Sequence, residues 1–155
     1  MFETIAIMRY VDEAFEGPPL QPETAAQRAE MDQWMSAVND VYYDAMIHRL
    51  VLERLAPMIF ERDPNEQNIK SALPDIEHQL DVLDSRFQVS PYLANENVTL
   101  ADILLIPIIF TVAMTPEGDN FVSNRPDLAR WQKGMAGRTS LIETMPPFSW
   151  DSPFE

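Results

Sequence analysis

Two adjacent tyrosines, Tyr42 and Tyr43, are the best candidates in this sequence for contact with a small molecule. A tyrosine joins an apolar ring to a polar hydroxyl group, and that combination suits contact with an aromatic molecule. Tyrosines on a long helix are more often core or interface residues, so both roles stay open for this pair. The nine methionines allow the same two interpretations, as an adaptable apolar pocket or as side chains that fill gaps in the core.

Other kinds of chemistry lack the residues they need. The chain has no cysteine, which excludes disulfides and a thiol nucleophile within these residues. Neither His48 nor His78 has a second histidine or a cysteine at the spacing of metal ligands, so we expect no zinc site. No nucleophile elbow is present, and four scattered glycines could not build a phosphate-binding loop. The sequence therefore predicts no self-contained catalytic centre, no cofactor and no metal.

The charge of the chain restricts its partners. A formal net charge of −14 repels nucleic acid and anionic membrane surfaces, both of which require clustered Lys and Arg. The longest apolar run, residues 103–110, is too short to span a bilayer. No basic segment followed by an apolar one opens the chain, so no signal peptide is visible and a cytoplasmic location is the expectation.

The elements that position these residues are all expected to be helices. With 155 residues, 46 % of them hydrophobic, the chain is long enough for one domain with a sizeable core. Gly17-Pro18-Pro19 ends the first helix and Pro57 marks a break in the second. Caps and apolar periodicity predict helices over residues 3–15, 24–55, 64–87, 99–114, 126–136 and 140–143.

Helical spacing also predicts which side chains point inward and where helices begin. In the second helix the inward stripe is Met31, Trp34, Val38, Val41 and Ala45, and Met35, Tyr42 and Met46 widen it. In the third it is Ile69, Leu73, Ile76, Leu80, Leu83 and Phe87, and in the fifth Leu128, Trp131 and Met135. Thr24 with Gln27 forms a capping box. We expect Asp63 to cap the third helix, with Pro64 in its first turn and Glu66 completing the box.

The strongest local signal is the start of the fourth helix. Thr99 is placed to cap the first-turn N–H groups, and Asp102, three residues later, to accept from the N–H of the cap residue. Val98 and Ile103 flank this box at the spacing of a hydrophobic staple. The apolar run that follows predicts that this helix is the buried centre of the domain.

The order of motifs around this box resembles the C-terminal helical domain of cytosolic glutathione transferases, in which the box caps the central helix. The motifs are Pro91-Tyr92-Leu93-Ala94, Thr115-Pro116-Glu117-Gly118, Arg125-Pro126-Asp127-Leu128-Ala129-Arg130-Trp131 and Arg138-Thr139-Ser140. There are two departures. Asn95 stands where the family usually has a turn glycine, and asparagine tolerates the left-handed conformation that such a turn requires. Thr139, directly before Ser140, stands where the family usually has a proline.

The resemblance implies an organisation into four segments. Residues 1–16 correspond to the last helix of a thioredoxin-like domain, 17–23 to a linker, 24–145 to a glutathione transferase C-terminal helical bundle, and 146–155 to a tail rich in proline and aromatic residues. The rest of the thioredoxin-like domain, with the activating Ser, Tyr or Cys and the cis-proline loop, has no counterpart in this sequence. The aromatic side chains of the tail are expected to pack on the domain.

The resemblance also assigns roles to residues. Glu3 would bind the amino group of the γ-glutamyl end of glutathione, and Thr4 its carboxylate. Tyr42 and Tyr43 would line the pocket for the hydrophobic substrate. A helix N-terminus suits an anion, because it offers free N–H donors and a positive dipole end. The implied protein is a homodimer, joined through its first two long helices, with glutathione as possible co-substrate.

Three interpretations of function remain open. The chain is the greater part of a transferase that conjugates or reduces electrophiles with glutathione, and it is inactive without the thioredoxin-like part. Alternatively, it is a non-catalytic helical binding or dimerisation module descended from such an enzyme, or it obtains a thioredoxin-like partner from another polypeptide. In each case we expect an apolar face that is open, or is covered by a dimer partner or by the aromatic tail.

Overall fold

The computed structural model describes residues 1–144, with only the backbone of Asp119, and these residues form helices and no strand. The predicted all-α fold is thereby confirmed, whereas the predicted tail, 146–155, lies outside the described residues. In chain order the elements are α1 (Thr4–Ala14), α2 (Ala25–Ala37), the π-helix η1 (Val38–Val51), α3 (Leu52–Arg54), α4 (Ala56–Phe60), α5 (Glu66–Val89), α6 (Leu100–Ala113), α7 (Gly118–Ser123), α8 (Pro126–Ala136) and α9 (Thr139–Thr144).

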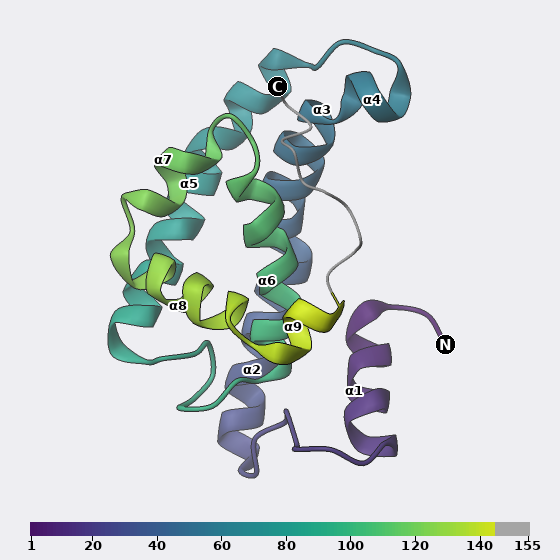
Figure 1. The fold of residues 1–155 in the computed structure, drawn as a ribbon, viewed down its shortest axis with the longest axis vertical. Coiled ribbons are helices and arrows are strands. Elements are labelled where there is room, and N and C mark those ends of the chain that lie inside the picture. Colours follow the sequence, from purple (N-terminus) through teal and green to yellow (C-terminus); the bar gives the residue numbers. More distant parts are fainter. Residues whose placement is uncertain (145–155) are drawn as a thin grey trace.

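Helix α6 forms the centre of the domain, as the capping box and the apolar run predict. It contacts α1, α2, η1, α7 and α8. Of its residues, Leu105 and Ile109 are fully buried, and they join a core to which α2, η1, α5 and α8 also contribute. Figure 1 shows α1, in purple, standing at one side of this bundle. No helix of the described part of the chain is long and apolar enough to cross a membrane.

The second predicted helix departs from α-helical geometry halfway along. Its start is confirmed, because Thr24 Oγ1 accepts a hydrogen bond of 3.3 Å from the Gln27 N–H. From Val38 onward, however, the chain forms the π-helix η1, whose wider turn rotates later residues relative to an α-helix. The prediction that Val41 points inward is therefore wrong, since 53 % of its surface is exposed, and Tyr42 takes the buried position beside it.

The predicted cap of α5 is also wrong. The structure places the cap at Asn65 rather than Asp63, and Asn65 Oδ1 accepts a 3.1 Å hydrogen bond from the Asn68 N–H. The physical reason is Glu53, whose carboxylate accepts from the Asn65 N–H at 3.0 Å and keeps the preceding residues out of the helix. Most of the predicted stripe is buried as expected; Leu73 is partly exposed.

The turn after α6 contains a short helix, α7, that the sequence pattern does not predict. Gly118 opens it at a point where a Cβ atom would collide with the backbone of Val112 and Ala113. Only glycine fits this close approach between α7 and the end of α6. Helix α8 then begins at Pro126, with Leu128, Trp131 and Met135 buried as predicted.

Candidate functional site

The start of α1 carries the two residues to which the resemblance assigns the binding of glutathione. Glu3 is the N-cap and Thr4 the first helical residue, and both are exposed. The Glu3 side chain makes no capping hydrogen bond, so the first-turn N–H groups keep the open donors of a helix N-terminus. Glu3 also has a φ of 68° and a ψ of 121°, a strained conformation for a residue with a side chain.

Polar contacts hold α1 on the domain together with Ile5 and Met8, which are partly buried and pack against the core. The helix contains no buried residue. Arg9 pairs with Asp32 of α2 and donates to Gln21 Oε1 at 3.2 Å. Asp12 accepts from the Leu20 N–H at 2.8 Å and from Gln21 Nε2 at 3.1 Å. These contacts fix the position of the Glu3–Thr4 end relative to the bundle.

The linker after α1 is tied to the centre of the domain. The Leu100 N–H, at the first residue of α6, donates to the Leu20 carbonyl oxygen at 3.3 Å. One of the first-turn N–H groups that have no acceptor within α6 therefore donates to the linker. Because Leu20 is also bonded to Asp12, α1, the linker and α6 form one connected unit.

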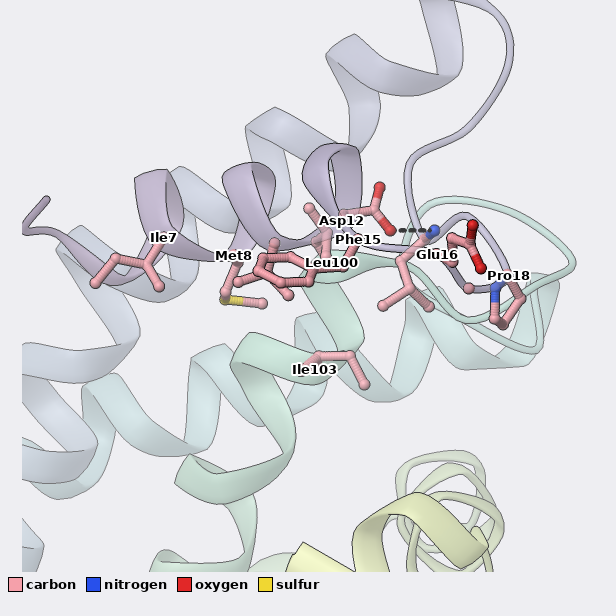
Figure 2. Close-up of a pocket in the computed structure, with 11 residues that line it drawn as sticks. Ile7, Met8, Asp12, Phe15, Glu16, Pro18, Leu100 and Ile103 are labelled. Atoms are coloured by element: carbon pink, nitrogen blue, oxygen red, sulfur yellow. Dashed lines mark hydrogen bonds between the residues drawn. The ribbon is translucent and has the colours of Figure 1, made fainter.

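An apolar groove lies between α1 and the start of α6. Figure 2 shows Ile7 and Met8 of α1, Phe15 directly after that helix, and Leu100 and Ile103 of α6 around it. Its volume is about 330 Å³, and Asp12 and Glu16 are the acidic side chains among its lining residues. The sequence pattern did not predict this groove, because it depends on where Arg9 and Asp12 place α1.

The two tyrosines occupy different environments. Tyr42 is 5 % exposed and belongs to the hydrophobic core, and burial raises the pKa of its hydroxyl group to about 12. Tyr43 is exposed on η1, with its ring edge-on to His48 at a centroid distance of 5.0 Å. Of the pair, Tyr43 is thus the side chain that a molecule in solution can reach. Tyr42 has the other role that the sequence left open, that of a core residue.

The capping box of α6 is the best-connected polar group in the core. Asp102 is fully buried, and its Oδ2 accepts from the Thr99 N–H and the Thr99 hydroxyl group, both at 2.9 Å. Its Oδ1 accepts from the Leu93 N–H and from Trp131 Nε1, both at 3.0 Å. Burial raises the pKa of the Asp102 carboxyl group above its usual range, and the donated hydrogen bonds oppose that shift. The sequence pattern does not predict the hydrogen bond from Trp131, which joins α8 to this box.

A second carboxylate, which the sequence pattern does not indicate, accepts several hydrogen bonds just after the C-terminal end of η1. Glu53 is largely buried and accepts from Arg62 at 2.7 Å and from Asn68 Nδ2 at 3.3 Å, besides the Asn65 N–H. The hydrogen bond from Arg62, above all, lowers the pKa of Glu53 to about 2. In the described part of the chain, no group of three or more His, Cys, Asp or Glu side chains could hold a metal ion.

A comparison with known protein families identifies the family to which the chain belongs. The sequence profile of the family described as "Glutathione S-transferase, C-terminal domain" matches residues 43–139. The chain belongs to this family.

Individual relatives agree with this assignment. Glutathione S-transferase F9 of Arabidopsis thaliana is 28 % identical over 154 residues, a match that covers 97 % of this chain and 70 % of the relative. Glutathione S-transferase 3 of Zea mays is 26 % identical over 149 residues, covering 94 % and 65 %. The chain therefore matches its relatives over nearly its whole length but spans only part of theirs.

Solved structures show the same fold. Glutathione S-transferase III in its apo form has a TM-score of 0.83 at 25 % identity, over 96 % of this chain and 70 % of that one. Glutathione transferase F7 from Populus trichocarpa has a TM-score of 0.82 at 22 % identity, over 92 % of this chain and 68 % of that one. Both comparisons extend beyond the profile match.

Proposed function

We propose that this chain supplies the helical, electrophile-binding part of a glutathione transferase, an enzyme that conjugates or reduces electrophiles with glutathione. The observation that carries the proposal is the exposed, uncapped start of α1, docked on a domain of this family. Family membership alone would be compatible with a helical module that has no role in glutathione chemistry. The Glu3–Thr4 end adds a place where one end of glutathione can bind.

The chemistry of that end matches the γ-glutamyl group. Its carboxylate is stabilised by the positive end of the α1 dipole and by the open N–H groups, and the Thr4 hydroxyl group can donate to it. The Glu3 carboxylate then pairs with the ammonium group next to it. The positive φ of Glu3 supports this assignment, because backbone strain is concentrated at ligand sites.

The remaining parts of the reaction fall to other groups. In this proposal the glutathione thiolate is formed by a thioredoxin-like domain that these 155 residues do not include, whether it belongs to the same polypeptide or to another. We therefore expect the chain by itself to be catalytically silent. Tyr43, the exposed member of the tyrosine pair, is the better candidate for contact with the electrophile. A cytoplasmic homodimer, joined through α2–η1 and α5, completes the proposal.

Calorimetric titration of the chain with glutathione tests the half-site. We expect binding near the millimolar range, which corresponds to about 4 kcal/mol, because only one end of the ligand is held. Glu3→Ala should abolish detectable heat, whereas Glu77→Ala, at an exposed glutamate on α5, should leave the titration unchanged. Absence of binding by the wild-type chain, or equal binding by Glu3→Ala, would refute the half-site and favour the non-catalytic helical module.

A further inference from the structure

A glutamine in the middle of α5 is buried without full use of its hydrogen-bonding groups. Gln79 is 6 % exposed and shares its face of the helix with Ile76 and Leu80, which are fully buried. Its Nε2 donates to the Val41 carbonyl oxygen of η1 at 3.3 Å. Its Oε1 is buried and accepts no hydrogen bond from any residue that the structure describes.

Stability does not explain an amide at this position. A buried acceptor without a partner costs free energy, and a single neutral hydrogen bond does little more than offset the desolvation of its donor. An apolar side chain of the same shape would avoid both costs. The best-attested role of such a buried polar group is to specify one arrangement of packed helices, at a cost in stability. The backbone atom that Gln79 does reach therefore indicates what it specifies.

That atom lies where the second long helix leaves α-helical geometry. Helix α2 ends at Ala37 and η1 begins at Val38, so Val41 belongs to the first turn of the π-helix. In an α-helical continuation the apolar periodicity would turn the Val41 side chain toward the core, whereas in η1 that side chain is exposed. Rotating Val41 inward would move its carbonyl oxygen, and a bond that is already 3.3 Å long tolerates little displacement. The bond from Gln79 is therefore specific to the π-helical form.

The π-helical form has a second consequence on the exposed side of η1. The rings of Tyr43 and His48 meet edge-on, with their centroids 5.0 Å apart and an interplanar angle of 86°. Side chains three or four positions apart are neighbours on an α-helix, whereas a π-helix bonds residues five apart and brings them to one side. Asp44 Oδ1 lies 3.7 Å from His48 Nδ1 and supports the histidine from the preceding turn. The ring contact is thus a marker of the π-helical form.

We propose that Gln79 is a positioning residue, whose bond to Val41 selects the π-helical form of η1 and thereby holds the exposed Tyr43 ring against His48. A ring held in one orientation loses less conformational entropy when an aromatic electrophile packs against it, so the affinity of that contact rises. The step to the electrophile rests on the proposed function, whereas the dependence of the ring contact on Gln79 does not. If the buried apolar side chains of η1 alone selected its form, the ring contact would not depend on Gln79.

Proton NMR of the whole chain tests this dependence. A nuclear Overhauser effect (NOE) between the ring protons of Tyr43 and His48 reports their contact, and Tyr43→Phe and His48→Gln assign the resonances. We expect this NOE in the wild-type chain and its loss in Gln79→Met, which keeps the shape of the side chain but has no amide. Gln88→Met is the matched control at an exposed glutamine of α5, and it should retain the NOE.

A second ring contact distinguishes positioning from a general loss of structure. Phe87 and Trp131 stack in the core with their centroids 4.8 Å apart, and their NOE should persist in Gln79→Met. Retention of the Tyr43–His48 NOE in Gln79→Met would overturn the proposal, as would its absence from the wild-type chain. Loss of both NOEs together would assign Gln79 a merely structural role and also contradict it. If Gln79→Met does not fold, Gln79→Leu replaces it and is judged by the same outcomes.

Titration with nitrobenzene separates this inference from the proposed function. Nitrobenzene should shift the Tyr43 ring resonances of the wild-type chain, and Gln79→Met should weaken this binding about threefold or more, because the ring must then be ordered on binding. Equal binding by both chains, with the NOE lost in the variant, would contradict the positioning role. A Gln79-dependent NOE without any nitrobenzene shift at Tyr43 would instead refute the electrophile contact of the proposed function, and the selection of the π-helical form by Gln79 would stand.

Discussion

Replacing Asp102 tests whether the capping box holds the domain together. The carboxylate accepts hydrogen bonds from the N–H groups of Leu93 and Thr99 and from the indole of Trp131, and all three residues are buried. Asp102→Ala leaves these three donors without an acceptor in a place that water does not reach. A buried unsatisfied donor costs about 1–3 kcal/mol, so we expect a loss of about 3–6 kcal/mol of unfolding free energy after partial relaxation.

A loss of this size is a large part of the stability of a domain, which is about 5–15 kcal/mol in total. Asp102→Asn gives a smaller effect, because its amide keeps one acceptor oxygen but turns an NH₂ group toward a backbone donor. We expect it to cost about 1–3 kcal/mol. Asp75→Ala is the control: its carboxylate is mostly exposed and pairs with Arg49, so less than about 1 kcal/mol is at stake.

Urea unfolding followed by circular dichroism measures all three variants. The reasoning is refuted if Asp102→Ala costs no more than Asp75→Ala at an unchanged urea dependence. If Asp102→Ala does not fold, Asp102→Asn and Trp131→Phe decide the matter. Trp131→Phe removes a single donor from the box, and we expect it to cost about 1–3 kcal/mol through the lost bond to a charged acceptor.

Two further predictions concern the ends of the bundle. Because the folded pKa of Glu53, about 2, lies below its ordinary 4.5, the stabilisation from its carboxylate is present above pH 4.5 and is lost as the pH falls toward 2. We therefore expect Glu53→Gln to cost about 1–3 kcal/mol at pH 7 and progressively less below pH 4.5; a cost that is constant with pH in urea unfolding would contradict this. Arg9→Ala removes the contacts of α1 with Asp32 and Gln21, so amide hydrogen exchange in α1 should accelerate about fivefold or more while that in α6 is unchanged. Equal exchange in α1 of both proteins would show that its apolar side is sufficient to hold it.

The helix starts that the sequence predicted correctly depend on residues close together in the chain. Thr99 and Asp102 are three residues apart, as are Thr24 and Gln27, and each pair forms the hydrogen bond that its spacing suggests. The central position of α6 follows from its apolar run. These features need no knowledge of distant parts of the molecule.

The features that sequence reasoning missed depend on contacts between distant residues. Asp63-Pro64 is a good local start signal, but Glu53 binds the N–H of Asn65 from 12 residues away and moves the cap. The exposure of Val41 follows from the π-helical geometry of η1, which no local motif indicates.

The candidate site is similarly divided between what the sequence could and could not predict. Glu3 and Thr4 were proposed by resemblance to a family and not by their own pattern, and their strained, uncapped conformation is visible only in the structure. The groove beside α1 depends on the pairing of Arg9 with Asp32, which lie 23 residues apart. Side chains on two separate helices create that surface, so neither helix reveals it alone.

The most direct test of the glutathione half-site is an amide NMR titration of the whole chain with glutathione. If Glu3 and Thr4 hold the γ-glutamyl end, the amide resonances of Thr4, Ile5 and Ala6 should shift first and furthest, at millimolar ligand, and Glu3→Ala should suppress those shifts. Shifts confined to other helices, or none up to concentrations well above the millimolar range, would contradict the claim that this chain takes part in glutathione binding.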